Sequence, residues 1–467
     1  MNKRITLLRQ KIAGGAQHEG NGKFNAAARS RLLAASVACL VLGSWAALGA
    51  DGIAPVAPGA SDSLVILPSY NPDTPPDLLD GTLSGIGDEE ENDEPKSGFL
   101  RFQDPLQSWL EFKQNVLQQD YGFSIGGSEG ILAQDFSNSL TNNHDAVGQK
   151  FTLNVGQQIL FRGTPDVMTI EAVIEDRGPV GTEFAPLQGG LRTGSSTATA
   201  STWGDFNLGV TQLYVRQDLL NHHFQYTFGK IFAPNYVNPY PLFDDNRQYL
   251  NQMYTTSVTI PVPLRGFGAV AALYPTNMGF YAKAGVYTVY SDDVGFTADS
   301  FFNRPQYFRH LELGWSGLAG TGTPIQGRGP MDANNLSITL WSKDANFDTG
   351  EGKSRGIAFN GNYQFRPDMM AFLRGGWSEG WQLDRSLNAG WGWRPFQQYS
   401  DLVGVAAGWA EPANHALRDQ YVAEGFYRFQ LTSQIALTPD LQWILHPTLN
   451  PNVGSLWVGS LRARITF

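Results

Sequence analysis

The chain has 467 residues, of which 16% are charged and 12% aromatic, with 52 glycines and a formal net charge of −10. Its mean hydropathy is −0.24. After Ala50 the chain also lacks the roughly 18 consecutive apolar residues that a spanning helix needs. Both observations argue against a helical membrane protein. The composition leaves two classes, a soluble all-β protein and a transmembrane β-barrel. The acidic surplus makes nucleic acid a poor partner.

Residues 1–50 have the pattern of an export signal with a long basic leader. An apolar run from Leu32 to Leu42 follows the leader, and small residues continue to Ala50. A membrane anchor is the weaker alternative, because the run is short and Ser36 and Gly43 interrupt it. The single cysteine, Cys39, lies inside this segment, so we expect a mature chain without disulfides. The basic side chains of the leader are Lys3, Arg4, Arg9, Lys11, Lys23, Arg29 and Arg31.

Residues 51–97 are rich in proline, aspartate and glycine and contain the acidic run Asp88–Glu94. Because this stretch has few apolar groups to bury and repels itself, it is predicted to be a disordered spacer. Binding of a basic partner in the cell envelope is the alternative reading. On the spacer reading, its deletion should leave transport unchanged.

The chain from residue 98 to residue 467 is predicted to be one β-barrel domain preceded by a short helix. Apolar residues recur near helical spacing from Pro105 to Gln119, which predicts that helix. From Tyr121 onwards, strands of eight to thirteen residues alternate apolar and polar positions. About fifteen such segments can be counted, and because bacterial single-chain barrels have an even number of strands, we expect sixteen and a water-filled channel. The long loops 178–204 and 316–334 should lie outside the barrel or fold into its mouth.

The last strand shows the alternation most clearly. One face carries apolar side chains and ends on the terminal residue, Phe467. In a membrane barrel that face contacts lipid, with aromatic residues at the interfaces. A C-terminal phenylalanine resembles the signal that the outer-membrane assembly machinery reads, so this machinery is an expected partner. The apolar face consists of Trp457, Gly459, Leu461, Ala463, Ile465 and Phe467, and the opposite face of Val458, Ser460, Arg462, Arg464 and Thr466.

Several segments of this predicted barrel resemble the carbohydrate-selective porins of the OprB type. The resemblance covers roughly residues 100–467 and is densest in the last part of the chain. It implies a monomeric, sixteen-stranded channel in the outer membrane of a Gram-negative bacterium, with a preference for neutral sugars. The segments that carry it are Leu213–Ile231, Leu242–Leu250, Asp401–Trp409, Leu417–Phe429, Leu437–Gln442 and Leu461–Phe467.

The candidate constriction follows from the alternation in the strand after Gly163. If Ile170 and Ile174 face lipid, then Glu171 and Glu175 face the lumen. We expect Glu171, Glu175 and Arg177, supported by Arg162, to form an acid–base cluster across the pore, with ordinary ion pairs of the lumen wall as the alternative. A second candidate set on one lumen face consists of Gln212, Tyr214 and Arg216.

Patterns typical of enzymes have little support. The stretch Gly126–Gly130 matches G-x-S-x-G around Ser128, but a nucleophile elbow requires a strand-to-helix turn that the sequence does not predict. The acidic stretch Asp344–Asp348 resembles a calcium loop, but Arg355 stands where a glutamate is required. We therefore expect neither an enzyme nor a cofactor.

The leading hypothesis is passive diffusion of mono- or small oligosaccharides through a water-filled barrel. A channel for sugar acids or other small solutes is the alternative within the same class, and a basic constriction would favour it. A secreted carbohydrate-binding β protein and an outer-membrane hydrolase that uses Ser128 are alternatives from other classes.

Overall fold

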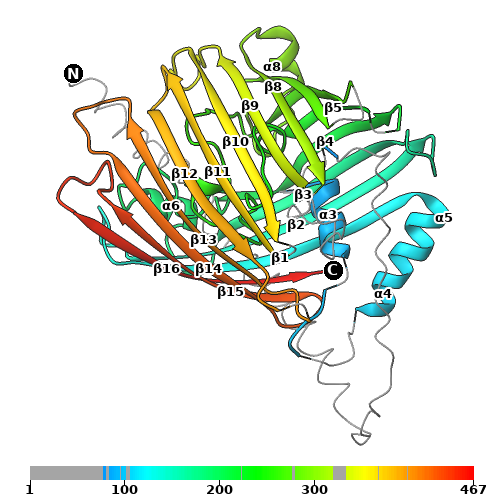
Figure 1. Cartoon of the computed structure of the whole chain (residues 1–467), viewed down its shortest axis with the longest axis horizontal. Coiled ribbons are helices and arrows are strands. Elements are labelled where there is room, and N and C mark those ends of the chain that lie inside the picture. Colours follow the sequence, from blue (N-terminus) through cyan, green and yellow to red (C-terminus); the bar gives the residue numbers. More distant parts are fainter. Residues whose placement is uncertain are drawn as a thin grey trace, which may run out of the picture. The chain divides into compact units, whose positions relative to one another are not determined.

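A computed structural model of the chain describes residues 77–79, 84–94, 96–100, 106–221, 223–275, 279–318, 333–366, 368–396 and 398–467. Within these residues, sixteen antiparallel strands form a closed barrel in which each strand pairs with its neighbours in sequence and β1 pairs with β16 (Figure 1). The predicted sixteen-stranded barrel is therefore confirmed. The predicted export signal and the first part of the predicted spacer lie outside the described residues.

The strand bounds are β1 Phe123–Phe136, β2 Asp145–Leu160, β3 Met168–Pro179, β4 Phe206–Leu219, β5 Phe224–Phe232, β6 Arg265–Leu273, β7 Phe280–Thr288, β8 Tyr307–Leu318, β9 Ala333–Lys343, β10 Ser354–Arg366, β11 Met369–Glu379, β12 Leu383–Trp393, β13 Leu402–Pro412, β14 Gln420–Gln430, β15 Ile435–Leu445 and β16 Ser455–Thr466. Because β8 extends to Leu318 and β9 begins at Ala333, the predicted loop 316–334 is shorter than expected, and residues 319–332 are not described.

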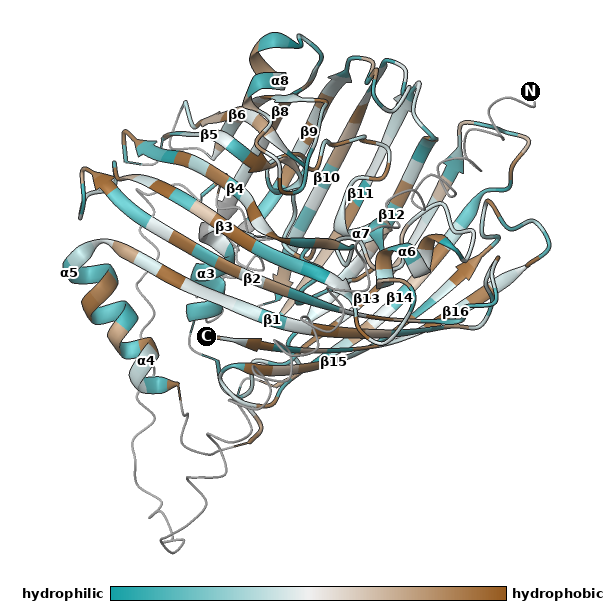
Figure 2. Cartoon of the chain, turned by 180° about the vertical axis from the view of Figure 1, so that it is seen from behind, coloured by the Kyte–Doolittle hydropathy of each residue, from teal (hydrophilic) through white to brown (hydrophobic). Residues whose placement is uncertain are grey.

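The strands alternate between an apolar outer face and a polar inner face, visible as alternating brown and teal bands in Figure 2. On β3, the side chain of Ile170 is 40% exposed, whereas those of Glu171 and Glu175 are 1% and 0% exposed. On β16, Trp457 and Leu461 point outwards, and Arg462 and Arg464 are buried. The predicted faces of both strands are confirmed. An apolar side chain that faces outwards is stable here because lipid covers the outer wall.

The longest connections lie at one end of the barrel, and several short connections lie at the other. The β2–β3, β4–β5, β10–β11 and β14–β15 links are short, and we call their end the turn end. The β2–β3 link includes Gly163 at φ 73°, a left-handed conformation that favours glycine. The β3–β4 and β5–β6 links are long, and we call their end the loop end. In bacterial barrels the short turns face the periplasm.

A helical segment before β1 confirms the helix predicted from Pro105 to Gln119. It consists of α4 Gln107–Phe112, the π-helical turn η1 Lys113–Gln118 and α5 Gln119–Tyr121. It ends at Gly122, which has φ 63°. None of the helices among the described residues is long and apolar enough to cross a membrane.

Part of the predicted disordered spacer is instead a helix inside the barrel. Helix α3, Ile86–Asp93, contains most of the acidic run, and Asp88, Glu89, Glu91 and Asn92 on it are buried. The prediction of disorder is wrong for these residues because it assumed that the acidic side chains face only water. In the fold they face cations from distant parts of the sequence, such as Arg464 on β16 and Arg247 in the β5–β6 link.

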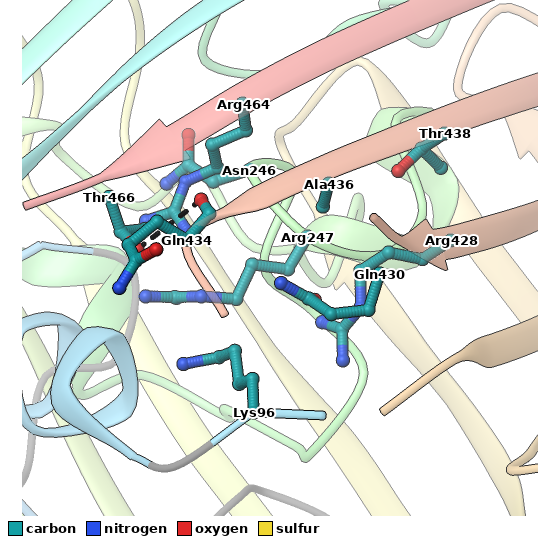
Figure 3. A pocket seen from close by; sticks show the side chains of 10 residues that line it. All are labelled: Lys96, Asn246, Arg247, Arg428, Gln430, Gln434, Ala436, Thr438, Arg464 and Thr466. Atoms are coloured by element: carbon teal, nitrogen blue, oxygen red, sulfur yellow. Dashed lines mark hydrogen bonds between the residues drawn. The ribbon is translucent and has the colours of Figure 1, made fainter. Parts of the chain in front are cut away.

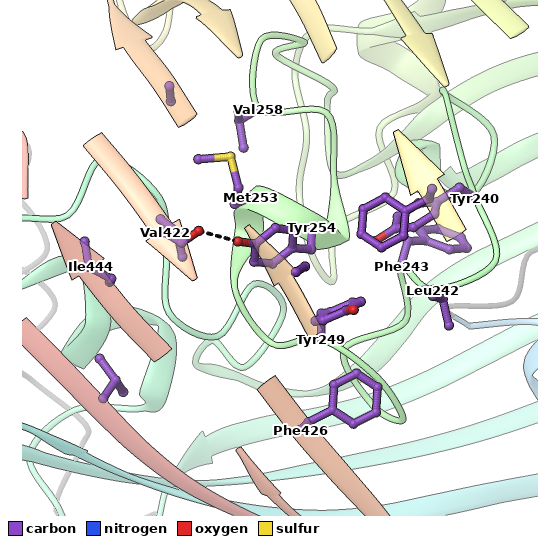
Figure 4. Close-up of a cluster of buried hydrophobic side chains, with 14 of the residues drawn as sticks. Tyr240, Leu242, Phe243, Tyr249, Met253, Tyr254, Val258, Val422, Phe426 and Ile444 are labelled. Carbon is purple, nitrogen blue, oxygen red and sulfur yellow. Dashed lines mark hydrogen bonds between the residues drawn. The ribbon is translucent and has the colours of Figure 1, made fainter. Parts of the chain in front are cut away.

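The β5–β6 link, residues 233–264, also lies in the lumen, and we call it the inner segment. It contains the 3-10 turn η2 Ala233–Asn235 and the short helix α7 Gln252–Thr255. Its aromatic and aliphatic side chains pack against apolar inward-facing residues of β11 to β16, such as Phe372. Figure 4 shows Val422 and Phe426 of this cluster. Burial of this surface fixes the inner segment against one side of the barrel wall. Two further short helices lie in links at the loop end, α6 Pro186–Leu191 and α8 Ala298–Asn303.

Candidate channel constriction

A charged cluster in the lumen surrounds the carboxylate of Glu175. Arg177, two positions along β3, pairs with one carboxylate oxygen. Arg265, the first residue of β6, donates to the other oxygen at 2.8 Å and to Asp293 at 2.9 Å. Glu175 and Arg177 are two residues apart on β3, so both side chains point to the inner face of the strand. Closure of the barrel brings the start of β6 close to them. We call Glu175, Arg177, Arg265 and Asp293 the upper cluster.

Aromatic rings flank the guanidinium groups of the upper cluster. The guanidinium carbons of Arg177 and Arg265 each lie 5.1 Å from the ring centroid of Phe206, and that of Arg265 lies 4.7 Å from the ring of Phe232. Cation–π contact and ion pairing together hold both arginines in one position. The cluster therefore offers hydrogen-bond donors, acceptors and flat apolar faces within a small region.

The β3–β4 loop folds into the lumen beside the upper cluster. Thr202 in this loop donates its backbone N–H to Asp245 of the inner segment, and Arg177 donates to the carbonyl of Thr202. Lys150 on β2 pairs with Asp245 at 3.4 Å. Gln420 on β14 bonds Ser195 and Thr197 in the same loop. Loop 178–204 was expected to lie outside the barrel or to fold into its mouth, and these residues adopt the second arrangement.

Arg162 does not belong to this cluster, and its predicted role is wrong. Its exposed side chain lies in the β2–β3 turn and donates to the carbonyl of Gln119 on α5. The strand β2 ends at Leu160, so the alternation used to place Arg162 stops before that residue. Glu171 faces the lumen as predicted, but closer to the turn end, and its carboxylate oxygens have no hydrogen-bond partner among the described residues.

The second candidate set faces the lumen and contacts the chain before β1. Gln212 donates to Ser84 and accepts from the N–H of Phe232. Arg216 pairs with Asp77 and Asp218 and donates to the carbonyl of Leu79. Tyr214 is buried beside Gly85. The structure therefore separates the predicted site residues into an upper group and a group around residues 77–94.

A small basic pocket lies at the turn end of the lumen (Figure 3). Its four cationic side chains are Lys96, Arg247, Arg428 and Arg464, and the lining contains no carboxylate. The neighbouring anions come from the inner segment and from α3. Arg247 pairs with Asp88 at 2.5 Å and with Glu91 at 3.2 Å. The amide side chains of the pocket are Asn246, Gln430 and Gln434.

Buried polar contacts tie the inner segment to the opposite wall. Arg374 on β11 donates to the carbonyl of Asn238 at 2.8 Å and to that of Tyr254 at 3.2 Å. Glu424 on β14 accepts the backbone N–H groups of Leu250 and Asn251. The Tyr254 hydroxyl donates to the carbonyl of Val422 (Figure 4). Hydrogen bonds to its backbone and to its side chains therefore hold the inner segment, which narrows the lumen, against the wall.

Sequence reasoning missed Arg265, Arg374 and Glu424 as parts of the constriction. Arg265 follows a proline-containing stretch with no alternation. By contrast, the charged stretch Asp244–Arg247 in an otherwise aromatic region predicts a loop folded into the pore, and Arg247 lies in the lumen. Arg374 and Glu424 occupy inward positions of β11 and β14. The alternation of apolar and polar residues along each strand could have identified both positions as facing the lumen.

The residues that resemble enzyme or calcium motifs take part in strand pairing and ion pairs. Ser128 lies within β1, opposite Thr152 of β2 and Thr466 of β16, and not at a strand-to-helix turn. Asp348 pairs with Arg304 at 2.8 Å, and Asp344 pairs with Arg309 at 3.0 Å. The described part of the chain contains no group of three or more His, Cys, Asp or Glu side chains that could hold a metal ion.

Comparisons with known proteins agree with this architecture. Residues 388–467 match the family described as carbohydrate-selective porin, OprB family. OprB of Pseudomonas putida in its high-pH structure has a TM-score of 0.61 at 13% identity, covering 77% of this chain and 97% of that one. Its low-pH structure has a TM-score of 0.46 at 13% identity, covering 78% and 98%. An uncharacterized protein of Nostoc sp. is 30% identical over 77 residues, which are 15% of this chain and 13% of that protein.

The closed barrel, its apolar outer face and its charged, narrowed lumen define the class of protein, an outer-membrane porin. Within this class, residues 388–467 are similar to the OprB family of carbohydrate-selective porins. The resemblance inferred from the sequence is thereby confirmed, and the likeness to the P. putida structure shows the shared fold.

Proposed function

We propose that the channel carries neutral mono- and small oligosaccharides across the outer membrane by passive diffusion. The observation that carries this proposal is the upper cluster, where Glu175 lies between Arg177 and Arg265 and the rings of Phe206 and Phe232 flank the arginines. Sugar hydroxyls can exchange hydrogen bonds with such charged groups, and the C–H face of a sugar ring can pack on an aromatic face. Weak and repeated contacts of this kind allow a solute to enter and leave.

The charge balance of the upper cluster favours a neutral solute. Two arginines face two carboxylates, those of Glu175 and Asp293. Since each charge has a partner of opposite sign, the cluster orients dipoles without a large net attraction for ions.

A channel for sugar acids is the second candidate, and the basic pocket favours it. Lys96, Arg247, Arg428 and Arg464 line that pocket without a carboxylate among them. A carboxylate-bearing sugar would find charge-assisted donors there.

Single-channel conductance in planar bilayers tests the proposal. Glucose should reduce the ion current of the wild type in a concentration-dependent way, and gluconate should do so less strongly. Phe206→Ala keeps the ion pairs but removes an aromatic face, so it should weaken the block by glucose several-fold and leave ion conductance nearly unchanged. Phe280→Ala, which removes a ring from the exposed outer face, is the matched control and should behave as wild type.

An unchanged glucose block in Phe206→Ala would remove the upper cluster from sugar recognition. A stronger block by gluconate than by glucose would favour the second candidate. We propose in addition that the barrel acts as a monomer, that residues 1–50 direct export, and that the assembly machinery reads the strand ending at Phe467.

A further inference from the structure

Helix α3 lies against the lumen side of several strands. Asp88 accepts a hydrogen bond from Asn154 on β2 at 2.8 Å. Asn92 accepts one from Arg464 on β16 at 2.7 Å. Just before the helix, Ser84 accepts a hydrogen bond from Gln212 on β4. Strands β16, β1 and β2 are consecutive around the barrel, and only β3 separates β2 from β4, so α3 and the residues just before it lie along this part of the inner wall.

Helix α3 also contacts the inner segment, which reaches the rest of the wall. Arg247 pairs with Asp88 and Glu91, and it donates to Asn92 at 2.9 Å. The inner segment is bonded in turn to Glu424 on β14 and Arg374 on β11. A continuous chain of contacts therefore crosses the lumen from β2 through α3 and the inner segment to β14.

The contacts of α3 are mainly polar and ionic. Its sequence, IGDEEEND, has no basic residue, and the buried Asp88, Glu91 and Asn92 contact arginines and an asparagine. An eight-residue helix is too short to be stable alone in water, so its helical form depends on docking. Because water can replace polar contacts at little net cost, such docking can be reversed more easily than the packing of an apolar core.

The backbone before α3 is shaped for this position. Gly85 has φ 113°, and a Cβ atom at this residue would lie 2.5 Å from the hydroxyl oxygen of Tyr214. A residue other than glycine would be strained in its backbone and would press on Tyr214. The approach to the wall at this point thus requires glycine.

From these contacts we propose that α3 is a lumenal plug, which keeps the channel closed while it is docked and opens a path along Arg247, Arg464 and Asn154 when it leaves through the turn end. The chain on both sides of α3 fits this route. After α3, Phe99 and Leu100 donate backbone hydrogen bonds to Gln430 and Leu431 at the β14–β15 turn. Before it, Asp77 pairs with Arg216.

A reversible disulfide tests the plug directly. A Cβ atom at Gly126 on β1 would lie 3.3 Å from Cγ of Glu89, so cysteines at these two positions can approach the geometry of a disulfide. The only natural cysteine is Cys39, in the predicted export signal, and it can be replaced in all variants. In the double variant Glu89→Cys with Gly126→Cys, oxidation should lower the KCl conductance several-fold, and a reductant should restore it. Each single variant, treated in the same way, is the control.

Two variants that weaken the docking of α3, which we call release variants, test whether undocking opens the channel. Gly85→Ala and Asp88→Asn should each raise the KCl conductance or the fraction of time open several-fold, because each weakens docking. Gly454→Ala, where an added Cβ meets nothing within 4 Å, and Asp120→Asn, which changes an exposed acid on α5, are the matched controls.

Electrophoretic mobility before and after heating confirms that each variant forms a barrel. Equal conductance of the oxidised and reduced double variant would overturn the plug, and so would wild-type behaviour of both release variants. If the tethered variant does not assemble, the release variants decide. Because the current is carried by KCl without sugar, these outcomes do not depend on whether the channel recognises carbohydrates.

Discussion

Glu171 and Glu175 lie on the same face of β3, yet their surroundings predict opposite effects of removing their charge. Glu175 pairs with two arginines, whereas the Glu171 carboxylate has no hydrogen-bond partner among the described residues. Glu175→Gln should lower the free energy of unfolding by about 3 kcal/mol, because removing one partner leaves buried charge uncompensated. Glu171→Gln should leave stability unchanged or raise it. Thermal loss of the folded band on electrophoresis measures both.

Ion selectivity provides a second measurement on the same two variants. Glu175→Gln leaves the upper cluster with one unbalanced positive charge, because Arg265 keeps its ion pair with Asp293, so the reversal potential in a KCl gradient should shift towards anion preference. The shift for Glu171→Gln should be smaller, since no cation is released there. Equal shifts, or equal losses of stability, would contradict the different environments of the two carboxylates.

At the same scale, Glu89 on α3 predicts a dependence of plug docking on pH. Burial raises the pKa of this carboxyl from 4.5 to about 8, and the nearby Lys113 only partly opposes that shift. Docked Glu89 therefore holds a proton that released Glu89 loses. Docking is strongest below pH 4.5 and weakens as the pH rises towards about 8, by at most about tenfold per pH unit. Conductance should rise with pH over this window and level off above it.

Glu89→Gln should flatten this pH dependence. The groups that face Glu89 are Lys113 on η1, Asp93 and Glu90 on α3, Ser124 on β1 and Glu171 on β3. Lys96, whose pKa burial lowers to about 7, acts in the opposite direction. The difference between the wild type and Glu89→Gln isolates the contribution of Glu89, and identical pH profiles would show that this carboxyl does not control docking.

At the scale of elements, the inner segment depends on Glu424. This carboxylate accepts two backbone N–H groups, those of Leu250 and Asn251. Glu424→Ala should leave both donors unsatisfied, at a cost of about 1–3 kcal/mol each. We expect faster amide hydrogen exchange in residues 249–255 and larger fluctuations of the open-channel current. Glu424→Gln keeps an acceptor oxygen and should show a weaker effect, whereas wild-type exchange in Glu424→Ala would mean that the aromatic cluster alone holds the segment.

The elements also show what the sequence could and could not predict. The faces of β3 and β16 were predictable because lipid on one side and water on the other impose a period of two along each strand. Arg162 was misplaced because that period ends at the turn. The inner segment has no period, and its role depends on Phe372, Val422 and Phe426, more than a hundred residues further along the chain. Helix α3 was missed because composition alone does not show where Arg247 and Arg464 lie.

At the scale of the whole molecule, the barrel closes where β1 meets β16. Beyond the last ladder pair, Phe467 and Gly127 exchange two backbone hydrogen bonds of 3.0 Å, and the Phe467 ring stacks on Phe151. Deletion of Phe467 removes these contacts at the seam, so it should reduce the fraction of chains that assemble. Electrophoretic mobility of unheated membrane samples measures this fraction. Phe467→Tyr keeps the backbone and the ring and should assemble normally, and full assembly of the deletion variant would contradict this role of the last residue.

The acidic composition of α3 has an electrical consequence. Asp88, Glu89, Glu90, Glu91 and Asp93 give the helix up to five negative charges and no positive one. Each elementary charge that crosses the full potential changes in energy by about 2.3 kcal/mol per 100 mV. A voltage that is positive at the turn end would draw the docked helix out of the lumen, and the reverse polarity would press it inwards. The channel would then act as a rectifier, passing more current at one polarity than at the other.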